Sequence, residues 1–171
     1  MILVAMGVSG AGKTTIASAL ATRLGWTFAD GDAFHDAANI EKMHAGVPLT
    51  DLDRMPWLKR IAEWIDERRA AGEDAIIACS ALKRRYRDVL AKDRPDVHIL
   101  YLHASRELIA SRLHKRTGHF MPEALLDSQF ADLEEPARDE HPIRIDVEPP
   151  VEAIVDDIVG RLASLRRPSP P

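Results

Sequence analysis

The sequence has little or none of three features that would assign it to a common class: it has a single cysteine, no apolar run long enough to cross a bilayer, and no excess of basic residues. Because Cys79 is alone, no disulfide can form within the chain, which favours a reducing compartment. The segment after Met1 has no charged start and leads into a glycine-rich stretch instead of a signal-peptide cleavage site. We therefore expect a cytoplasmic protein with no membrane partner.

The charge balance is slightly acidic. The 23 basic residues face 27 acidic ones, which gives a formal net charge of −4, and the isoelectric point is near 6.0. We expect no nucleic-acid partner, because a broad basic surface for nucleic acid or anionic membrane is missing, although a local basic pocket is compatible with this balance. The predicted partner is a small anion. The length of 171 residues suits one domain with a real core.

One glycine-rich stretch carries the strongest chemical signal. Residues 7–14 read Gly-Val-Ser-Gly-Ala-Gly-Lys-Thr and match the phosphate-binding loop (P-loop) at every specified position. The apolar run 2–6 precedes the loop, and Ile16, Leu20 and Leu24 follow it at four-residue spacing, so we expect a loop between a buried strand and an amphipathic helix. The alternative is an ordinary glycine-rich turn with a surface lysine.

The loop predicts how a nucleotide would be held. Its backbone N–H groups are expected to face phosphate oxygens. Lys13 would reach the β and γ phosphates, and the Thr14 hydroxyl would ligate Mg²⁺. ATP and Mg²⁺ are thus the expected cofactors, and the predicted nucleotide-binding residues are Gly7, Ser9, Gly10, Ala11, Gly12, Lys13, Thr14 and Thr15.

Apolar stretches alternate with helical patterns along the rest of the chain. Strands are expected at residues 2–6, 26–29, 75–79, 97–102 and 143–147. Helical patterns separate them, including one that we expect to start at Asp53 as N-cap with Pro56 in its first turn, and one over about 80–92. The pattern predicts an α/β, three-layer P-loop NTPase fold, in which a five-stranded parallel sheet has helices on both faces. We expect one domain over 1–167 and a flexible tail over 168–171.

An acidic turn follows the second expected strand. Asp30 and Asp32 flank Gly31 at a strand end, where ligands of parallel sheets gather. A phosphoryl-transfer site needs one carboxylate near Mg²⁺ and another to orient the attacking hydroxyl, and we assign Asp30 to the first role and Asp32 to the second. Asp and Gly are also ordinary turn formers, so a merely structural turn is the alternative.

Two other P-loop classes lack their signatures. No Asn-Lys-x-Asp segment is present to read guanine, which argues against a signalling GTPase. The third expected strand ends at Cys79 and Ser80, where a motor or pump ATPase would have an aspartate for Mg²⁺. The short length and the paired aspartates favour a small-molecule kinase.

Several further segments occur after the loop in a specific order. They read Asp-Gly-Asp-Ala-Phe-His at 30–35, Asn-Ile-Glu-Lys-Met at 39–43, Gly-Val-Pro-Leu at 46–49, Asp at 51, Asp-Arg at 53–54, Pro-Trp-Leu at 56–58, Cys-Ser-Ala-Leu-Lys at 79–83, Tyr-Arg-Asp at 86–88, His-Phe-Met-Pro at 119–122, Leu-Leu at 125–126, Ser-Gln at 128–129 and Leu-Glu at 133–134. From the P-loop to about residue 136, this series resembles the gluconokinase family. One departure is Asp36, where the family commonly has proline after the histidine.

The resemblance implies ATP-dependent phosphorylation of D-gluconate to 6-phospho-D-gluconate. It also implies a fold like that of nucleoside monophosphate kinases and shikimate kinase, with a lid at about 115–135, and makes a homodimer plausible. The alternatives are a kinase of another small hydroxy acid such as shikimate, a nucleoside monophosphate kinase, or a non-catalytic ATP-dependent binding module.

Gluconate is a flexible carboxylate with several hydroxyls, so its site should combine cations with hydrogen-bonding groups. The candidates are His35, Lys42, Arg54 and Lys83, with His119 added from the lid segment. Arg54 is the first choice for the carboxylate because a planar guanidinium can bind two oxygens at once. The alternatives are an Arg54 paired with Asp51 or Asp53, a solvated helix face around Lys83, and a surface or capping His35.

Two arginines precede the expected lid loop. Arg112 and Arg116 lie four residues apart on one helix face, and the resemblance to kinase lids assigns them to the charge on the transferred phosphoryl group, Arg116 more firmly than Arg112. An exposed basic helix end is the alternative. Trp57 and Trp64 share a face of one expected helix and are interpreted as core residues, and Cys79 as a small buried residue.

Overall fold

The computed structural model describes residues 1–115 and 123–165, and it contains the predicted parallel sheet. The five strands lie in the order β2-β3-β1-β4-β5, and every neighbouring pair is parallel. Their bounds are β1 Ile2–Met6, β2 Thr27–Asp30, β3 Ala75–Ala78, β4 Val97–His103 and β5 Ile143–Asp146. The predicted tail at 168–171 lies outside the described residues.

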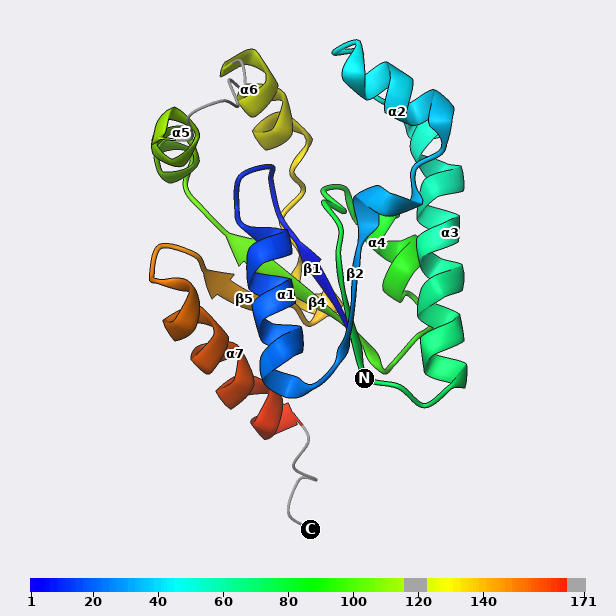
Figure 1. Ribbon diagram of the computed structural model, residues 1–171, viewed down its shortest axis with the longest axis vertical. Helices are drawn as coiled ribbons and strands as arrows, with labels where there is room; N and C mark the ends of the chain where they lie inside the picture. Colours follow the sequence, from blue (N-terminus) through cyan, green and yellow to red (C-terminus); the bar gives the residue numbers. More distant parts are fainter. Residues whose placement is uncertain (116–122, 166–171) are drawn as a thin grey trace.

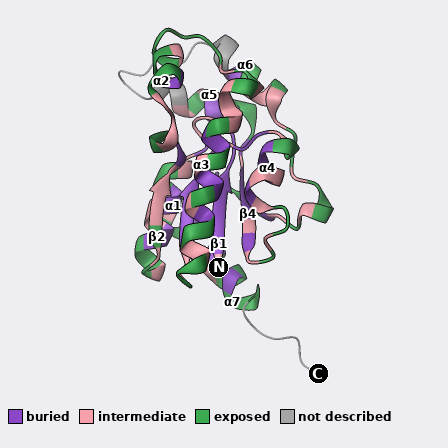
Figure 2. Ribbon diagram, turned by 90° about the vertical axis from the view of Figure 1, so that its right-hand side faces the viewer, coloured by how far each residue is buried: buried purple, intermediate pink, exposed green. Residues whose placement is uncertain are grey.

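Helices cover both faces of the sheet. The helices α1 (Lys13–Leu24) and α7 (Val151–Leu165) lie on one face, and α3 (Asp51–Ala70) and α4 (Arg84–Ala91) lie on the other (Figure 1). The central strand β1 is buried along its whole length, so the sheet forms the buried centre in Figure 2. Alternate β1 side chains pack into two apolar clusters, one on each face, which confirms the three-layer prediction.

Three helices stand beyond the carboxyl edge of the sheet. They are α2 (Ala37–His44) on one side and α5 (Arg106–Lys115) and α6 (Glu123–Asp132) on the other (Figure 1). Two short 3₁₀ helices, Gly31–Phe34 and Arg138–Glu140, precede α2 and β5. Among the described helices, none combines the length and the apolar composition needed to cross a membrane.

The start of α3 differs from the prediction. The N-cap is Thr50, not Asp53, and the helix begins at Asp51. The Thr50 hydroxyl accepts from the Asp53 backbone N–H, and the Asp53 carboxylate accepts from the Thr50 backbone N–H at 2.9 Å, which is a capping box. These two reciprocal hydrogen bonds satisfy two backbone amides at the start of α3, whereas a single N-cap side chain would satisfy one. Pro56 consequently lies inside the helix rather than in its first turn.

The start of α4 also differs. Residues 80–83 were expected to be helical, but the helix begins at Arg84 after the N-cap Lys83. Ala81 has φ of 41°, a left-handed conformation that a right-handed helix cannot contain. The backbone carbonyls of Ala81 and Leu82 instead accept hydrogen bonds from the buried Arg87. These bonds from a side chain five and six residues away replace the expected helical turn.

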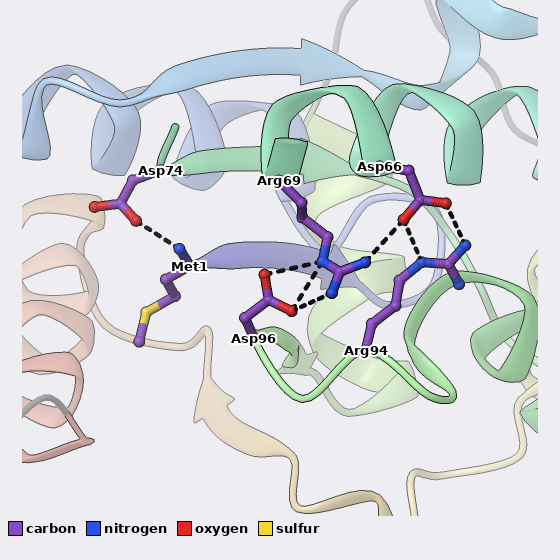
Figure 3. Close-up of polar contacts among 6 residues, drawn as sticks. All are labelled: Met1, Asp66, Arg69, Asp74, Arg94 and Asp96. Atoms are coloured by element: carbon purple, nitrogen blue, oxygen red, sulfur yellow. Dashed lines mark hydrogen bonds and ion pairs between the residues drawn. The ribbon is translucent and has the colours of Figure 1, made fainter. Parts of the chain in front are cut away.

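Charged side chains tie the elements together at the amino edge of the sheet, opposite the P-loop (Figure 3). The Arg69 guanidinium donates to both carboxylate oxygens of Asp96, at 2.8 and 2.9 Å, and to Asp66 at 3.0 Å. Arg94 donates to the two oxygens of Asp66 at 2.8 and 2.7 Å. This network links the C-terminal end of α3 to the segment that leads into β4.

This network should make the free energy of unfolding depend on pH in the acidic range. Hydrogen bonds from Arg94 and then Arg69 lower the pKa of Asp66 to about 2, against about 3.9 in an unfolded chain. Because the folded pKa is the lower one, the stabilisation is present above pH of about 4 and is lost as the pH falls towards 2. Urea unfolding at several pH values should show this loss. Asp66→Asn should flatten that part of the profile, and an unchanged profile would contradict the assignment.

Candidate functional site

The P-loop connects β1 to α1 and takes a shape that only glycine adopts easily. Gly10 and Gly12 have φ of 86° and 88°, in the left-handed region. Gly12 is the N-cap of α1, and no side chain caps the helix. The backbone N–H groups at the start of α1 therefore remain available for an anion, and the helix dipole favours negative charge there.

Lys13 lies against this loop. Its ammonium donates to the Val8 carbonyl at 3.0 Å, so the side chain is folded back along the loop. Burial lowers the pKa of Lys13, while the nearby charges of Asp32 and Asp30 oppose that shift. The loop thus holds a cation between the anion-binding amides and the acidic turn.

Gly7 has a different role from the other loop glycines. A Cβ atom on Gly7 would lie 2.7 Å from the Leu102 carbonyl oxygen, so β4 approaches too closely for any side chain. Of the predicted nucleotide-binding residues, Gly7 and Ala11 pack beneath the loop and do not line the cavity described below. The other six line it: Ser9, Gly10, Gly12, Lys13, Thr14 and Thr15.

The acidic turn meets the start of α1. The Thr14 hydroxyl donates to one carboxylate oxygen of Asp30 at 2.8 Å, and the other oxygen accepts the backbone N–H of Asp32 at 3.0 Å. The two residues predicted to hold Mg²⁺ are therefore in contact. Their oxygen atoms suit a hard cation that keeps several waters and uses few protein ligands.

The turn itself is held in place by close packing. A Cβ atom on Gly31 would lie 2.5 Å from the Ala78 carbonyl oxygen of β3. The indole N–H of the buried Trp57 donates to the Gly31 carbonyl at 2.7 Å. These contacts fix the backbone on which Asp30 and Asp32 are carried.

Gly31→Ala should therefore damage both stability and activity. The added methyl forces the turn or β3 to move, at a cost of about 1–3 kcal/mol, and moves the two carboxylates with it. Gly160→Ala is the matched control, because a Cβ at this position in α7 meets nothing within 4 Å and should stabilise the chain by about 0.5–1 kcal/mol. Denaturant unfolding and steady-state kinetics of both variants would measure this. Equal behaviour of the two would disprove the packing argument.

The loop and the acidic turn face one cavity of about 700 Å³. The predicted acceptor residues Asp32, His35 and Arg54 line it as well. The end of α2 and the segment after it contribute Met43, Gly46, Val47, Pro48 and Leu49, and α6 contributes Ser128, Gln129 and Asp132. One cavity therefore includes the phosphate-binding loop, the acidic turn and the predicted acceptor residue Arg54.

Of the arginine and two lysines predicted to bind the acceptor, Arg54 is the one that lines the cavity. Its Nε donates to the Leu49 carbonyl at 3.2 Å, and the guanidinium lies 5.6 Å from the centre of the Tyr86 ring. Among the described residues, no carboxylate forms an ion pair with Arg54, in contrast to the expected alternative pairing with Asp51 or Asp53. The charge is therefore available to an anionic ligand.

The two predicted lysines form ion pairs with carboxylates of the protein. The Lys42 ammonium donates to the Asp53 carboxylate at 2.7 Å, a bond that contributes most to lowering the pKa of Asp53 to about 2. The Lys83 ammonium lies 3.2 Å from Asp132 and 3.8 Å from Asp51. Neither lysine lines the cavity.

Of the two arginines assigned to the predicted lid, the structure describes the side chain of Arg112. Arg112 donates to the Val147 carbonyl, after β5, and does not line the cavity. Arg116 and His119 lie outside the described residues, as does the central part of the predicted lid at 116–122.

The interpretation of Cys79 as a small buried residue is confirmed, since the side chain is buried and burial raises its pKa to about 12.

Helix α6 contributes to the site although its sequence carries no chemical motif. The side-chain oxygen of Gln129 accepts the backbone N–H of Ser9 at 3.2 Å, so α6 contacts the P-loop directly. Asp132 on the same helix contacts Lys83. The only signal was the Ser-Gln pair in the family resemblance, because an amide on a helix carries no pattern of its own.

The fold and the P-loop define a class, that of the P-loop small-molecule kinases. A family model described as an AAA domain matches residues 2–136. A shikimate kinase structure from Aquifex aeolicus vf5 shares the fold alone, with a TM-score of 0.59 at 15% identity over 96% of this chain and 98% of that one.

Closer relatives narrow the class. A gluconokinase from Gluconobacter oxydans (strain 621H) is 49% identical over 157 residues, which cover 92% of this chain and 88% of that protein. A crystal structure of a gluconokinase from Sinorhizobium meliloti 1021 has a TM-score of 0.84 and 44% identity, over 95% of this chain and 91% of that one. The chain belongs to the gluconokinase family.

Proposed function

We propose that this kinase transfers the γ-phosphoryl group of ATP to D-gluconate and forms 6-phospho-D-gluconate. The observation that carries the proposal is the single cavity that joins the P-loop, the Thr14 and Asp30 oxygen pair, and the acceptor candidates Asp32 and Arg54. Family membership supports the acceptor. We also propose a homodimer and a cytoplasmic location, on the family resemblance and the single cysteine respectively.

The phosphate side of the cavity would hold ATP. The backbone amides at the start of α1 would bind phosphate oxygens, and the Lys13 ammonium would turn from the Val8 carbonyl to the β and γ phosphates. Thr14 and Asp30 would hold Mg²⁺, which supplies positive charge at the phosphate oxygens when bound. In this proposal Arg116 and Arg112 of the lid at about 115–135 neutralise further charge.

The other side of the cavity would hold the acceptor. Arg54 would bind the gluconate carboxylate, and His35 lines the same cavity. Lys42, Lys83 and His119 are further substrate-binding candidates on the family resemblance alone. Asp32 accepts a hydrogen bond from the terminal hydroxyl and orients its oxygen towards the γ-phosphorus. A bond forms between that oxygen and phosphorus, the bond from phosphorus to the bridging oxygen breaks, ADP leaves, and the hydroxyl proton passes to Asp32 or to solvent. Since such transition states are loose, positioning outweighs proton abstraction.

A panel of acceptors tests the proposal. ADP release is measured with purified protein, Mg²⁺-ATP and a set of sugar acids that includes gluconate and shikimate. A site that pairs specific hydroxyls should reject an acid that lacks them by roughly 10⁴ to 10⁵ in kcat/KM, so gluconate should stand out clearly. Preference for shikimate would overturn the proposal, and ATP binding without transfer to any acid would point to a non-catalytic binding module.

A further inference from the structure

The His35 ring forms part of the cavity wall in a fixed orientation. It stacks on the Trp57 ring with centroids 4.3 Å apart and planes 14° apart. Trp57 is itself held by burial and by its hydrogen bond to the Gly31 carbonyl. The plane of the imidazole is thus set by a residue that cannot easily move.

A buried amide lies at one edge of that ring. Asn39 on α2 is only 3% exposed, and its side-chain nitrogen donates to the Asp53 backbone carbonyl at 2.9 Å. A carbonyl oxygen can only accept, so this contact fixes which end of the amide is the NH₂ group. The orientation of the Asn39 side chain is therefore determined by the backbone of α3.

The same NH₂ group determines the tautomer of His35. The Asn39 side-chain nitrogen lies 3.5 Å from Nδ1 of His35. Because an NH₂ group has only hydrogens to offer, the atom that faces it must present a lone pair. Nδ1 is then unprotonated, and a neutral ring carries its proton on Nε2. Within the described part of the chain, no protein group accepts from Nε2.

The surrounding charges agree with a neutral ring. Burial lowers the pKa of His35, and the positive charges of Arg54 and Arg60 act in the same direction. The negative charges of Asp32 and Asp36 oppose the shift without reversing it. These four side chains carry the charges that shift the pKa of His35. An imidazole that is mostly neutral at pH 7 follows.

We infer that His35 binds the acceptor by donating from Nε2 to an oxygen of the polyhydroxy acid, and that Asn39 and Trp57 are positioning residues that fix its tautomer and its plane. The inference rests on the proposed acceptor site and assigns different roles to two of its residues. Arg54 supplies the charge for the carboxylate, while His35 supplies a directed hydrogen bond. A ring with the other tautomer would present a lone pair at Nε2, which could accept from a hydroxyl but could not donate to a carboxylate or hydroxyl oxygen.

The tautomer can be observed without any measurement of activity. Two-bond ¹H–¹⁵N correlation spectra of the full chain, labelled with ¹⁵N, distinguish the two neutral tautomers from the cation. The His35 signal is assigned by its disappearance in His35→Gln. We expect a neutral ring with the proton on Nε2 at pH 7. An Nδ1–H tautomer or an imidazolium would overturn the inference, whatever the acceptor panel shows.

Three variants test the link to binding. His35→Phe keeps a ring on Trp57 but removes the donor, so the KM for gluconate should rise about tenfold while the KM for ATP stays the same. His35→Gln keeps a donor and should lose less than His35→Phe. Asn39→Asp places an acceptor opposite Nδ1, so it should move the proton to Nδ1 and raise the KM for gluconate.

Each variant has an outcome that contradicts the inference. An unchanged gluconate KM in His35→Phe would remove His35 from the acceptor site. An unchanged tautomer in folded Asn39→Asp would remove Asn39 as the positioning residue. If Asn39→Asp does not fold, the spectrum of the unmodified chain decides the tautomer alone.

Discussion

Asp32→Asn should lower kcat by about 10² to 10⁴ while the Kd for ATP changes little. Asn has the same shape as Asp but cannot accept a proton. Its NH₂ group is a hydrogen-bond donor, whereas the gluconate hydroxyl needs a group that accepts its hydrogen. The Asp32 backbone N–H, rather than its carboxylate, forms the bond to Asp30. The substitution should therefore leave the turn, the Thr14 contact and the P-loop intact.

Two measurements separate turnover from binding. Steady-state ADP release gives kcat, and titration calorimetry with a non-hydrolysable ATP analogue gives the Kd. Asp157→Asn is the matched control: it makes the same change in charge at an exposed carboxylate that pairs with Arg161 on α7, far from the cavity. Unchanged turnover in Asp32→Asn would remove Asp32 from the mechanism.

Arg87→Met should destabilise the chain by about 3–5 kcal/mol, a large part of the stability of an ordinary domain. Arg87 is 1% exposed, and its guanidinium donates to both carboxylate oxygens of Glu140, at 2.6 and 3.0 Å. Burial alone would raise the pKa of Glu140, but the hydrogen bonds from Arg87 and the nearby backbone outweigh it, and the pKa is lowered. Without Arg87, the Glu140 carboxylate loses two hydrogen bonds and the Ala81 carbonyl loses its donor, while the Leu82 carbonyl keeps only the Glu134 backbone N–H.

The neighbouring Arg84 provides a matched control. It binds the carboxylate of Asp139, one residue before Glu140, at 3.2 and 2.6 Å, but both side chains are largely exposed. Exposed ion pairs contribute little to stability because water screens them. The Arg84→Met variant should therefore unfold at a urea concentration close to that of the unmodified chain. Urea unfolding of both variants measures the difference. Equal losses would contradict the view that burial decides the effect.

The sequence predicted the parts of the site that local pattern controls. The P-loop, the five parallel strands and the acidic turn each occupy a short stretch whose residue types fix its conformation. The carboxyl ends of neighbouring parallel strands lie at one edge, so the approach of Asp30 to Thr14 followed from topology.

Contacts between distant segments could not be predicted in the same way. Lys42 and Lys83 carry the right charge for an acid, but their pairing with Asp53 and Asp132 depends on how α2, α3, α4 and α6 pack. Residues 80–83 are not helical, because the Ala81 and Leu82 carbonyls accept from Arg87, whose guanidinium is held by the distant Glu140.

The glycines illustrate both cases. The P-loop pattern predicts that its three glycines let the backbone bend, and Gly10 and Gly12 have φ angles in the left-handed region. Gly7 and Gly31 must be glycine for another reason: a carbonyl oxygen of a neighbouring strand would lie 2.7 Å and 2.5 Å, respectively, from an added Cβ atom. Only the assembled sheet reveals that constraint.

A crystal structure with a non-hydrolysable ATP analogue, Mg²⁺ and gluconate tests the central geometric claim most directly. The account predicts the γ-phosphate at Lys13, the gluconate carboxylate on Arg54, and the terminal hydroxyl within hydrogen-bonding distance of the Asp32 carboxylate and facing the γ-phosphorus. Gluconate bound elsewhere in the cavity, with the Asp32 carboxylate turned away from its hydroxyls, would contradict it.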